Sequence, residues 1–292
     1  MVSKIGKNTT VRFLHIPKTA GSTLTSVLYR KYLRHNSFCF TGSPSQDMAR
    51  YNSLTAKQRS QIRLFVGHAP IVTGIKAADS AYTITLLRDP VARVKSFCQH
   101  VYEGKSPHLV QRFPPFRHFD LTDFLQNAPP DIFNLQTKML VNHLECAAPS
   151  VLTKMSSQAA VDLALQNLQS KVHTFGIQEM FDESMLHFAQ QFGWGVPFYA
   201  TKNAKQKDRP LLFKQHHLEQ IIAQNQLDMQ VYQTAKKLFV TQRTMRPRAL
   251  SVLQITNRVT AKVVHLFDLL IHQQKNKTTQ RTYSGSHGPS HG

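Results

Sequence analysis

The chain has 292 residues, of which 41% are hydrophobic and 18% charged, so its composition excludes a collagen, a coiled coil and a wholly disordered chain. Its 36 lysines and arginines outnumber its 16 aspartates and glutamates, which gives a net charge of +20. A positive field of this size favours anionic partners, such as nucleic acid, an acidic membrane, an acidic polysaccharide or a phosphorylated cofactor.

The cysteines and the two ends of the chain indicate in which cellular compartment the protein is expected. Cys39, Cys98 and Cys146 are odd in number and widely spaced, so neither a disulfide framework nor a zinc site is expected. Residues 1–8 lack the apolar core of a signal peptide, and the run 259–271 is too short and too polar to span a bilayer. From these features we expect a cytoplasmic protein without a transmembrane segment.

The chain opens with a strand, a turn and a helix. Residues 11–16 are typical of a buried strand, and residues 17–21 are typical of a turn. Apolar side chains recur at helical spacing over 22–34, which predicts a helix there. Ser22 or Thr23 is the expected N-cap of this helix.

Two more strands are expected before residue 90. The segments 62–66 and 82–87 are short, apolar and contain β-branched residues. Asp89 suits the N-cap of a helix and Pro90 suits its first position, so the strand at 82–87 leads directly into a second helix. That helix carries an apolar stripe formed by Val91, Val94, Cys98 and Val101.

The second half of the chain is less regular. The segment 104–130 is rich in Pro, Phe and His and is expected to be irregular, and residues 201–209 form a basic loop. The remaining expected elements are a strand at 172–177 and helices at 132–143, 158–169, 181–191, 216–242 and 248–273. We expect three parts: one domain over 1–245, an amphipathic helix over 246–273 and a disordered tail over 274–292.

The alternation of strands and helices predicts an α/β fold in which helices cover both faces of a parallel sheet. In such sheets, ligands bind beyond the C-terminal ends of the strands. Lys18, His68 and Arg88 each follow a predicted strand. We therefore expect these three residues on the same edge of the sheet.

The turn after the first strand has the residues of an anion-binding loop. A helix begins there, and its first backbone amides have no partner within the helix. Lys18 adds a full charge, and three hydroxyl side chains add further donors. The lysine precedes Gly21 rather than following it, so the turn is not the GxxxxGK[ST] motif of nucleotide triphosphate P-loops. The alternative is an ordinary capped turn with a solvated lysine.

The segments after the other two strands also contain candidate site residues. Arg88 suits bidentate binding of a phosphate, and Ser96 lies two helical turns beyond it. The alternative is that Arg88 pairs with Asp89 or with another carboxylate. His68 is a candidate general base, because imidazole titrates near neutral pH. With 15 histidines in the chain, the alternative is a surface residue.

Taken together, these motifs resemble those of one enzyme family, the carbohydrate sulfotransferases. Residues 13–24 (Phe-Leu-His-Ile-Pro-Lys-Thr-Ala-Gly-Ser-Thr-Leu) resemble the loop of that family that binds a 5′-phosphosulfate, and residues 86–96 resemble its 3′-phosphate motif. Residues 134–140 and 227–232 resemble two further helices of those domains. The likeness is closest to the heparan sulfate 2-O- and 6-O-sulfotransferases and runs from about residue 11 to about residue 242.

The resemblance implies a catalytic domain over 1–245 that is related to P-loop kinases. It also implies 3′-phosphoadenosine 5′-phosphosulfate (PAPS) as co-substrate, with no metal. By this likeness His68 takes the proton of the acceptor hydroxyl during in-line attack on sulfur, and Lys18 stabilises the leaving phosphate. The implied nucleotide-binding residues are Lys18, Thr19, Ala20, Gly21, Ser22, Thr23, Arg88 and Ser96, with Lys202 and Lys205 as weaker candidates.

The expected partner is a hydroxylated acceptor, in the first place a carbohydrate, and the positive charge suits an anionic one. No specific nucleic acid is expected, and the oligomeric state is left open. The helix at 246–273 is expected to pack on the domain, with a dimer contact or a peripheral membrane contact as the alternatives. Two other functions stay open, namely a non-catalytic polyanion-binding protein on the same fold and a small-molecule kinase that uses ATP.

Overall fold

A five-stranded sheet forms the centre of the molecule. The computed structural model describes residues 9–129, 132–141, 155–200, 210–243, 247–259 and 263. All neighbouring strands of the sheet are parallel, in the order β2-β3-β1-β4-β5. The strands are β1 (Val11–Leu14), β2 (Ser37–Phe40), β3 (Leu64–Gly67), β4 (Tyr82–Leu87) and β5 (Thr174–Ile177).

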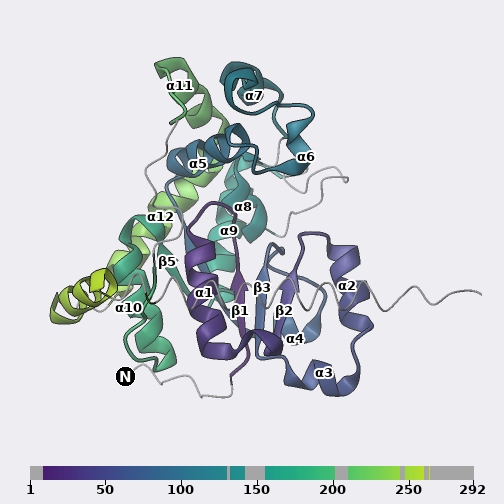
Figure 1. The fold of residues 1–292 in the computed structure, drawn as a ribbon, viewed down its shortest axis with the longest axis vertical. Coiled ribbons are helices and arrows are strands. Elements are labelled where there is room, and N and C mark those ends of the chain that lie inside the picture. The colour runs from purple at the N-terminus through teal and green to yellow at the C-terminus, as the bar shows by residue number, and fades with distance from the viewer. Residues whose placement is uncertain are drawn as a thin grey trace, which may run out of the picture.

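Helices lie on both faces of this sheet, which confirms the predicted P-loop-kinase-like α/β class (Figure 1). The helices that precede residue 130 are α1 (Gly21–Tyr32), α2 (Pro44–Asn52), α3 (Ala56–Gln61), α4 (Lys76–Asp79), α5 (Pro90–Tyr102), α6 (Pro107–Val110) and α7 (Leu121–Asn127). The later ones are α8 (Leu135–Leu140), α9 (Ser157–Ser170), α10 (Phe181–Phe192), α11 (Gln215–Gln224) and α12 (Gln226–Gln242). Within the described ranges, no helix has the length and apolar character needed to cross a bilayer.

The period-two alternation of strand side chains divides the core between the two faces. Phe13 of β1 packs with α1 and α10 on one face, whereas its neighbour Leu14 packs with α8, α9 and α12 on the other. A third cluster joins α5, α6, α7 and α11, which gather at one end of the molecule (Figure 1). Because α5 begins just after β4, this cluster lies beyond the C-terminal edge of the sheet.

Several expected elements are confirmed. Strand β4 has the predicted bounds, and β1, β5, α9 and α10 agree with prediction to within three residues. Asp89 caps α5 by accepting a hydrogen bond from the amide of Ala92 at 2.8 Å, and Pro90 is the first helical residue, as predicted. Gly193 ends α10 in the left-handed conformation.

The helix predicted over 216–242 is wrong as a single element. It is broken at Asn225 into α11 and α12. The Asn225 side chain is fully buried; it donates to the carbonyl of Ile221 at 2.7 Å and accepts from the amide of Asn134 at 3.0 Å. The hydrogen bond between Asn225 and the distant Asn134 forms at this break in the helix. The spacing of hydrophobic residues in the sequence does not indicate such a bond.

The segment 104–130, predicted to be irregular, contains α6 and α7. Asp120 caps α7 by accepting from the amides of Thr122 and Asp123 at 2.7 and 3.0 Å, and Leu121, Phe124 and Leu125 bury its apolar side. Strand β2 and helices α2, α3 and α4 are not among the predicted elements. They form the edge of the sheet beyond β3, where Phe38, Phe40 and Phe65 build a small aromatic core.

Residues 247–259 are helical, which agrees with the start of the helix predicted at 248–273. Leu253 is fully buried among residues of α1, α10 and the sheet. Asn257 accepts a hydrogen bond from the amide of Tyr199 at 3.1 Å, and Gln254 donates to Asp182 at 3.1 Å. This part of the helix packs on the domain, whereas residues 264–273 and the predicted tail at 274–292 lie outside the described residues.

We expect Leu253→Ala to lower the free energy of unfolding by about 2–5 kcal/mol, because it leaves a cavity under the C-terminal helix. Chemical denaturation of the full chain measures this loss. Val252→Ala, at a position 51% exposed on the same turn, is the matched control and should change stability by about 0.5 kcal/mol or less. Equal effects of the two substitutions would contradict the packing of this helix.

Candidate functional site

Three loops meet at the C-terminal edge of the sheet. Strand β1 lies between β3 and β4, and Leu14 is level with Gly67 on one side and Thr85 on the other. Lys18, His68 and Arg88 follow these strands, so the structure places all three on the predicted edge. The guanidinium Nη1 of Arg88 donates to the backbone carbonyl of Lys18 at 2.9 Å, which joins the first loop to the third.

The loop after β1 has an unusual backbone. Lys18 and Ala20 both have positive φ angles, of 70° and 65°, in the left-handed region that residues with a Cβ rarely adopt. The hydroxyl of Thr19, between them, is fully buried and donates to the carbonyl of Ile16 at 2.9 Å. Backbone strain of this kind costs about 1–3 kcal/mol per residue and clusters at ligand-binding sites. Because its hydroxyl is buried and bonded within the loop, Thr19 stabilises the loop through this side chain instead of presenting the hydroxyl to a ligand.

Helix α1 begins at Gly21, one residue before the predicted start at 22. Ala20 is its N-cap and forms no side-chain cap, so the prediction of Ser22 or Thr23 as N-cap is wrong. The left-handed Ala20 sets the first turn, and the amides of Thr23 and Leu24 bond to its carbonyl. The first turn carries no acidic residue. Its leading amides and the exposed Ser22 are therefore placed to bind an anion.

Gly21 is required by a close contact with His15. A Cβ built at Gly21 would overlap ring atoms of His15. The His15 ring is held on its other sides by Phe13, whose ring is stacked at 5.2 Å, and by His68, whose ring centre lies 4.5 Å away. Sequence reasoning assigned His15 to the strand and missed its place in the site.

The two ring nitrogens of His68 have different roles, and only Nδ1 bonds to His15. Its Nδ1 lies 2.7 Å from the backbone carbonyl of His15, and a carbonyl only accepts, so Nδ1 carries the hydrogen. The lone pair is then on Nε2. Burial lowers the pKa of the His68 imidazole, and the hydrogen bond to His15 offsets part of this effect. The imidazole is therefore neutral near pH 7 and has the form of a base.

Arg88 is fixed in place at both its ends. Its backbone amide and carbonyl bond to the side chain of Gln136, and its guanidinium bonds to Lys18. Burial lowers the pKa of Arg88, and the nearby carboxylates of Glu179 and Asp89 oppose that shift. Neither carboxylate forms an ion pair with Arg88 in the described structure, because Asp89 caps α5 and Glu179 accepts from Tyr232. The Nε atom of Arg88 is buried without a hydrogen-bond partner among the described residues.

Lys18 brings a second element, α5, into the site. Burial lowers the pKa of His100 on α5 to about 4, and the charge of Lys18 is the next largest cause. Burial also holds the pKa of His15 well below its ordinary value, with His68 and Lys18 adding to the effect. Ser96 lies one helical turn before His100 on α5 and is half-buried. His100 therefore lies near Lys18, although it carried no motif in the sequence, and Ser96 lies on the same side of α5 as His100.

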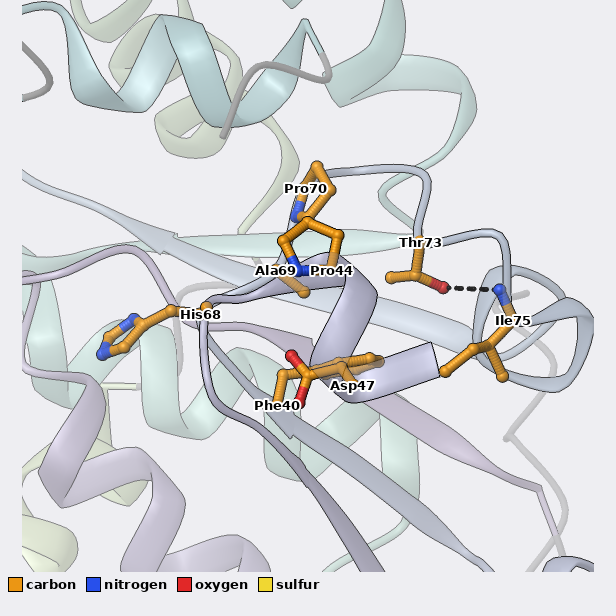
Figure 2. A pocket seen from close by; sticks show the side chains of 9 residues that line it. Phe40, Pro44, Asp47, His68, Ala69, Pro70, Thr73 and Ile75 are labelled. Atoms are coloured by element: carbon orange, nitrogen blue, oxygen red, sulfur yellow. Dashed lines mark hydrogen bonds between the residues drawn. The ribbon is translucent and has the colours of Figure 1, made fainter. Parts of the chain in front are cut away.

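A small pocket adjoins the site at His68, which lines it together with residues of the segments that follow β2 and β3 (Figure 2). The imidazole of His68 points away from the other side chains labelled there. The polar side chains of the pocket bond within the protein, because Asp47 accepts from the amide of Thr41 at 3.0 Å and Thr73 donates to Asp79 at 2.8 Å. Among the described residues, no three His, Cys, Asp or Glu side chains are grouped to hold a metal ion.

Comparison with known proteins gives an enzyme family for the chain as a whole. The sequence model of a protein family described as galactose-3-O-sulfotransferase matches residues 4–249, which is well over half of the chain and includes every residue named in the site. No curated protein matches the sequence. Lys202 and Lys205, the weaker nucleotide-binding candidates, lie outside the described residues.

We expect Gly21→Ala to lower the free energy of unfolding by about 1–3 kcal/mol, because the new methyl group overlaps the confined ring of His15. Adding His15→Ala should remove most of this penalty, since the two sites are in contact. Gly195→Ala is the control, because nothing lies within 4 Å of a Cβ there. Chemical denaturation of Gly21→Ala, His15→Ala, the double variant and Gly195→Ala tests the contact, and additive effects of the Gly21 and His15 substitutions would contradict it.

Proposed function

The chain belongs to the galactose-3-O-sulfotransferase family, and from this premise we propose that it transfers a sulfuryl group from PAPS to a hydroxyl group of a carbohydrate. Membership confirms the predicted class of PAPS-dependent carbohydrate O-sulfotransferase. The closer likeness to the heparan sulfate enzymes stays a prediction. The observation that carries the proposal is the hydrogen bond from Arg88 to Lys18, because it joins the two loops that we propose to bind the two ends of the donor.

The donor fits the residues that surround this bond. The leading amides of α1, Lys18 and Ser22 would hold the 5′-phosphosulfate, together with the backbone from Thr19 to Thr23. Arg88 and Ser96 would hold the 3′-phosphate. The half-buried guanidinium of Arg88 supports this assignment, because a ligand can reach it and its Nε has no partner among the described residues.

Bound PAPS supplies a sulfuryl group carried on a phosphate leaving group. His68 would take the proton of the acceptor hydroxyl at Nε2, and its Nδ1 hydrogen bond to the His15 carbonyl would hold the ring in the required tautomer. Lys18 and the helix amides would neutralise the negative charge that develops on the leaving phosphate. The proton thus ends on His68 and the charge ends beside Lys18.

The acceptor is proposed to be a carbohydrate, and galactose is the first sugar to test because it stands in the family's description. The net charge of +20 favours glycans that already carry acidic groups. Incubation with labelled PAPS and a panel of neutral and acidic galactosides, lipids and phenols tests this choice. Transfer to phenols alone would contradict a carbohydrate acceptor.

We expect the protein to bind adenosine 3′,5′-bisphosphate at least about tenfold more tightly than ADP, because Arg88 recognises the 3′-phosphate with a charge-assisted hydrogen bond. Isothermal titration calorimetry measures both affinities. Arg88→Met should remove most of the preference. Equal affinity of the unaltered protein for the two nucleotides would instead favour the small-molecule kinase.

We expect His68→Asn to lower kcat by about 10²–10⁴-fold with little change in affinity for adenosine 3′,5′-bisphosphate, since the general base is lost and the nucleotide contacts stay. Protonation of His68 removes the base, so activity should fall with acid, at a midpoint below the ordinary imidazole value of about 6.5. Initial rates across pH, measured with the active acceptor, test both points.

His35→Asn is the matched control, because this exposed histidine lies just before β2 and so at the opposite, N-terminal edge of the parallel sheet. It should leave both kcat and the acid limb unchanged. A His68→Asn variant with full activity would contradict the assigned base. Tight glycan binding with no transfer by the unaltered protein would favour the non-catalytic polyanion-binding protein.

A further inference from the structure

Gln136, the second residue of α8, holds the backbone of Arg88 from both sides. Its Oε1 accepts from the Arg88 amide at 2.9 Å, and its Nε2 donates to the Arg88 carbonyl at 2.8 Å. Gln136 is only 1% exposed. We propose that Gln136 is a positioning residue that aims Arg88 at the 3′-phosphate and so sets the preference for 3′-phosphorylated donors; this rests on the proposed function.

The two hydrogen bonds fix the direction in which Arg88 leaves the backbone. A single carboxamide that pairs with both the amide and the carbonyl of one residue restrains rotation of the peptide units on either side of it. Arg88 directly follows the buried strand β4, so its Cα is also held by the sheet. The guanidinium lies four bonds out from this Cα, so a small backbone rotation would move it by a larger distance.

Gln136 is itself anchored by a buried carboxylate. Asp228 of α12 is fully buried and accepts from the amide of Gln136 at 3.2 Å and from the amide and hydroxyl of Thr137 at 2.7 and 2.8 Å. The Nε of Arg93 of α5, also fully buried, lies 3.9 Å from Oδ2 of this carboxylate, the oxygen that accepts from Gln136. The first turn of α8 is therefore clamped between α5 and α12.

Asn134 completes the clamp at the start of α8. Its side-chain oxygen accepts from the amides of Leu227 and Asp228, both at 3.1 Å, and its own amide donates to Asn225 at 3.0 Å. Its φ angle of 51° is left-handed, a conformation that asparagine tolerates better than most residues. The break between α11 and α12 at Asn225 thus serves to hold α8, and through Gln136 it holds Arg88.

The guanidinium of Arg88 indicates the purpose of this positioning. Nη1 bonds to the Lys18 carbonyl, while the buried Nε has no partner among the described residues. The Nε atoms of Arg12 and Arg93 are also buried without a partner, but those two side chains are fully buried, whereas Arg88 is half-buried and can be reached by a ligand. The geometry is that of a guanidinium kept ready for an acceptor that arrives with the ligand.

The experiment compares two nucleotides in the full chain by isothermal titration calorimetry. Adenosine 3′,5′-bisphosphate carries the 3′-phosphate, and adenosine 5′-phosphate lacks it. Gln136→Met removes both hydrogen bonds to Arg88 at similar volume. We expect it to weaken binding of the bisphosphate by about tenfold and binding of the 5′-phosphate by less than about twofold.

The matched control is Asn167→Leu. Asn167 is another buried carboxamide, and it donates to the carbonyl of Leu140 at 2.7 Å, at the opposite end of α8. This substitution also removes a buried hydrogen bond to α8 but leaves Arg88 untouched. It should lower the thermal unfolding midpoint in the same direction as Gln136→Met while the ratio of the two affinities stays at the value of the unaltered protein.

Gln136→Asn keeps the carboxamide but is one methylene too short to reach both groups of Arg88. It provides the measurement if Gln136→Met does not fold, and the same loss of nucleotide preference is expected. A preference that is present in the unaltered protein and survives in the folded Gln136 variant overturns this inference alone. Equal binding of both nucleotides by the unaltered protein overturns the proposed function as well.

Discussion

The hydrogen bond from Arg88 to the carbonyl of Lys18 is the interaction on which the site depends. It exists because the sheet order places β4 directly beside β1, so that loops 70 residues apart in the chain end side by side. Through this bond, the positively charged guanidinium of Arg88 lies beside the loop after β1, which carries Lys18. In the proposed function, each of the two loops binds one end of a ligand that carries a phosphate at both ends.

Arginines hold the loops after β1 and β3 and the segment that precedes α8. Arg12 of β1 is fully buried and donates to the carbonyls of Pro70 and Ile71, just beyond His68. Arg88 donates to the loop after β1, and Arg93 donates to the carbonyl of Ile132, just before α8. Burial lowers the pKa of Arg12 to about 10, a value at which it is still charged near neutral pH. A guanidinium suits this use because it presents several donors in a rigid plane.

The sequence predicts a helix or strand correctly where one short segment is enough to determine that element. The Asp89-Pro90 pair starts α5 and the β-branched run makes β4, so both were predictable to the residue. The edge strand β2 was not, because Ser37–Phe40 is four residues long and is held by pairing with β3. The roles of Gln136 and His15 were also out of reach. Each depends on partners more than 40 residues away or on a ring packed across the site, and neither leaves a periodic pattern.

The left-handed backbone at Lys18 and Ala20 has a kinetic consequence. Alanine at such a position is strained in the folded chain, so the turn keeps its shape only because the surrounding packing enforces it. A turn that is already formed does not need to rearrange when an anion reaches it. The rate of capture is then governed by diffusion and by attraction to the positively charged surface, and it should slow as added salt screens that attraction.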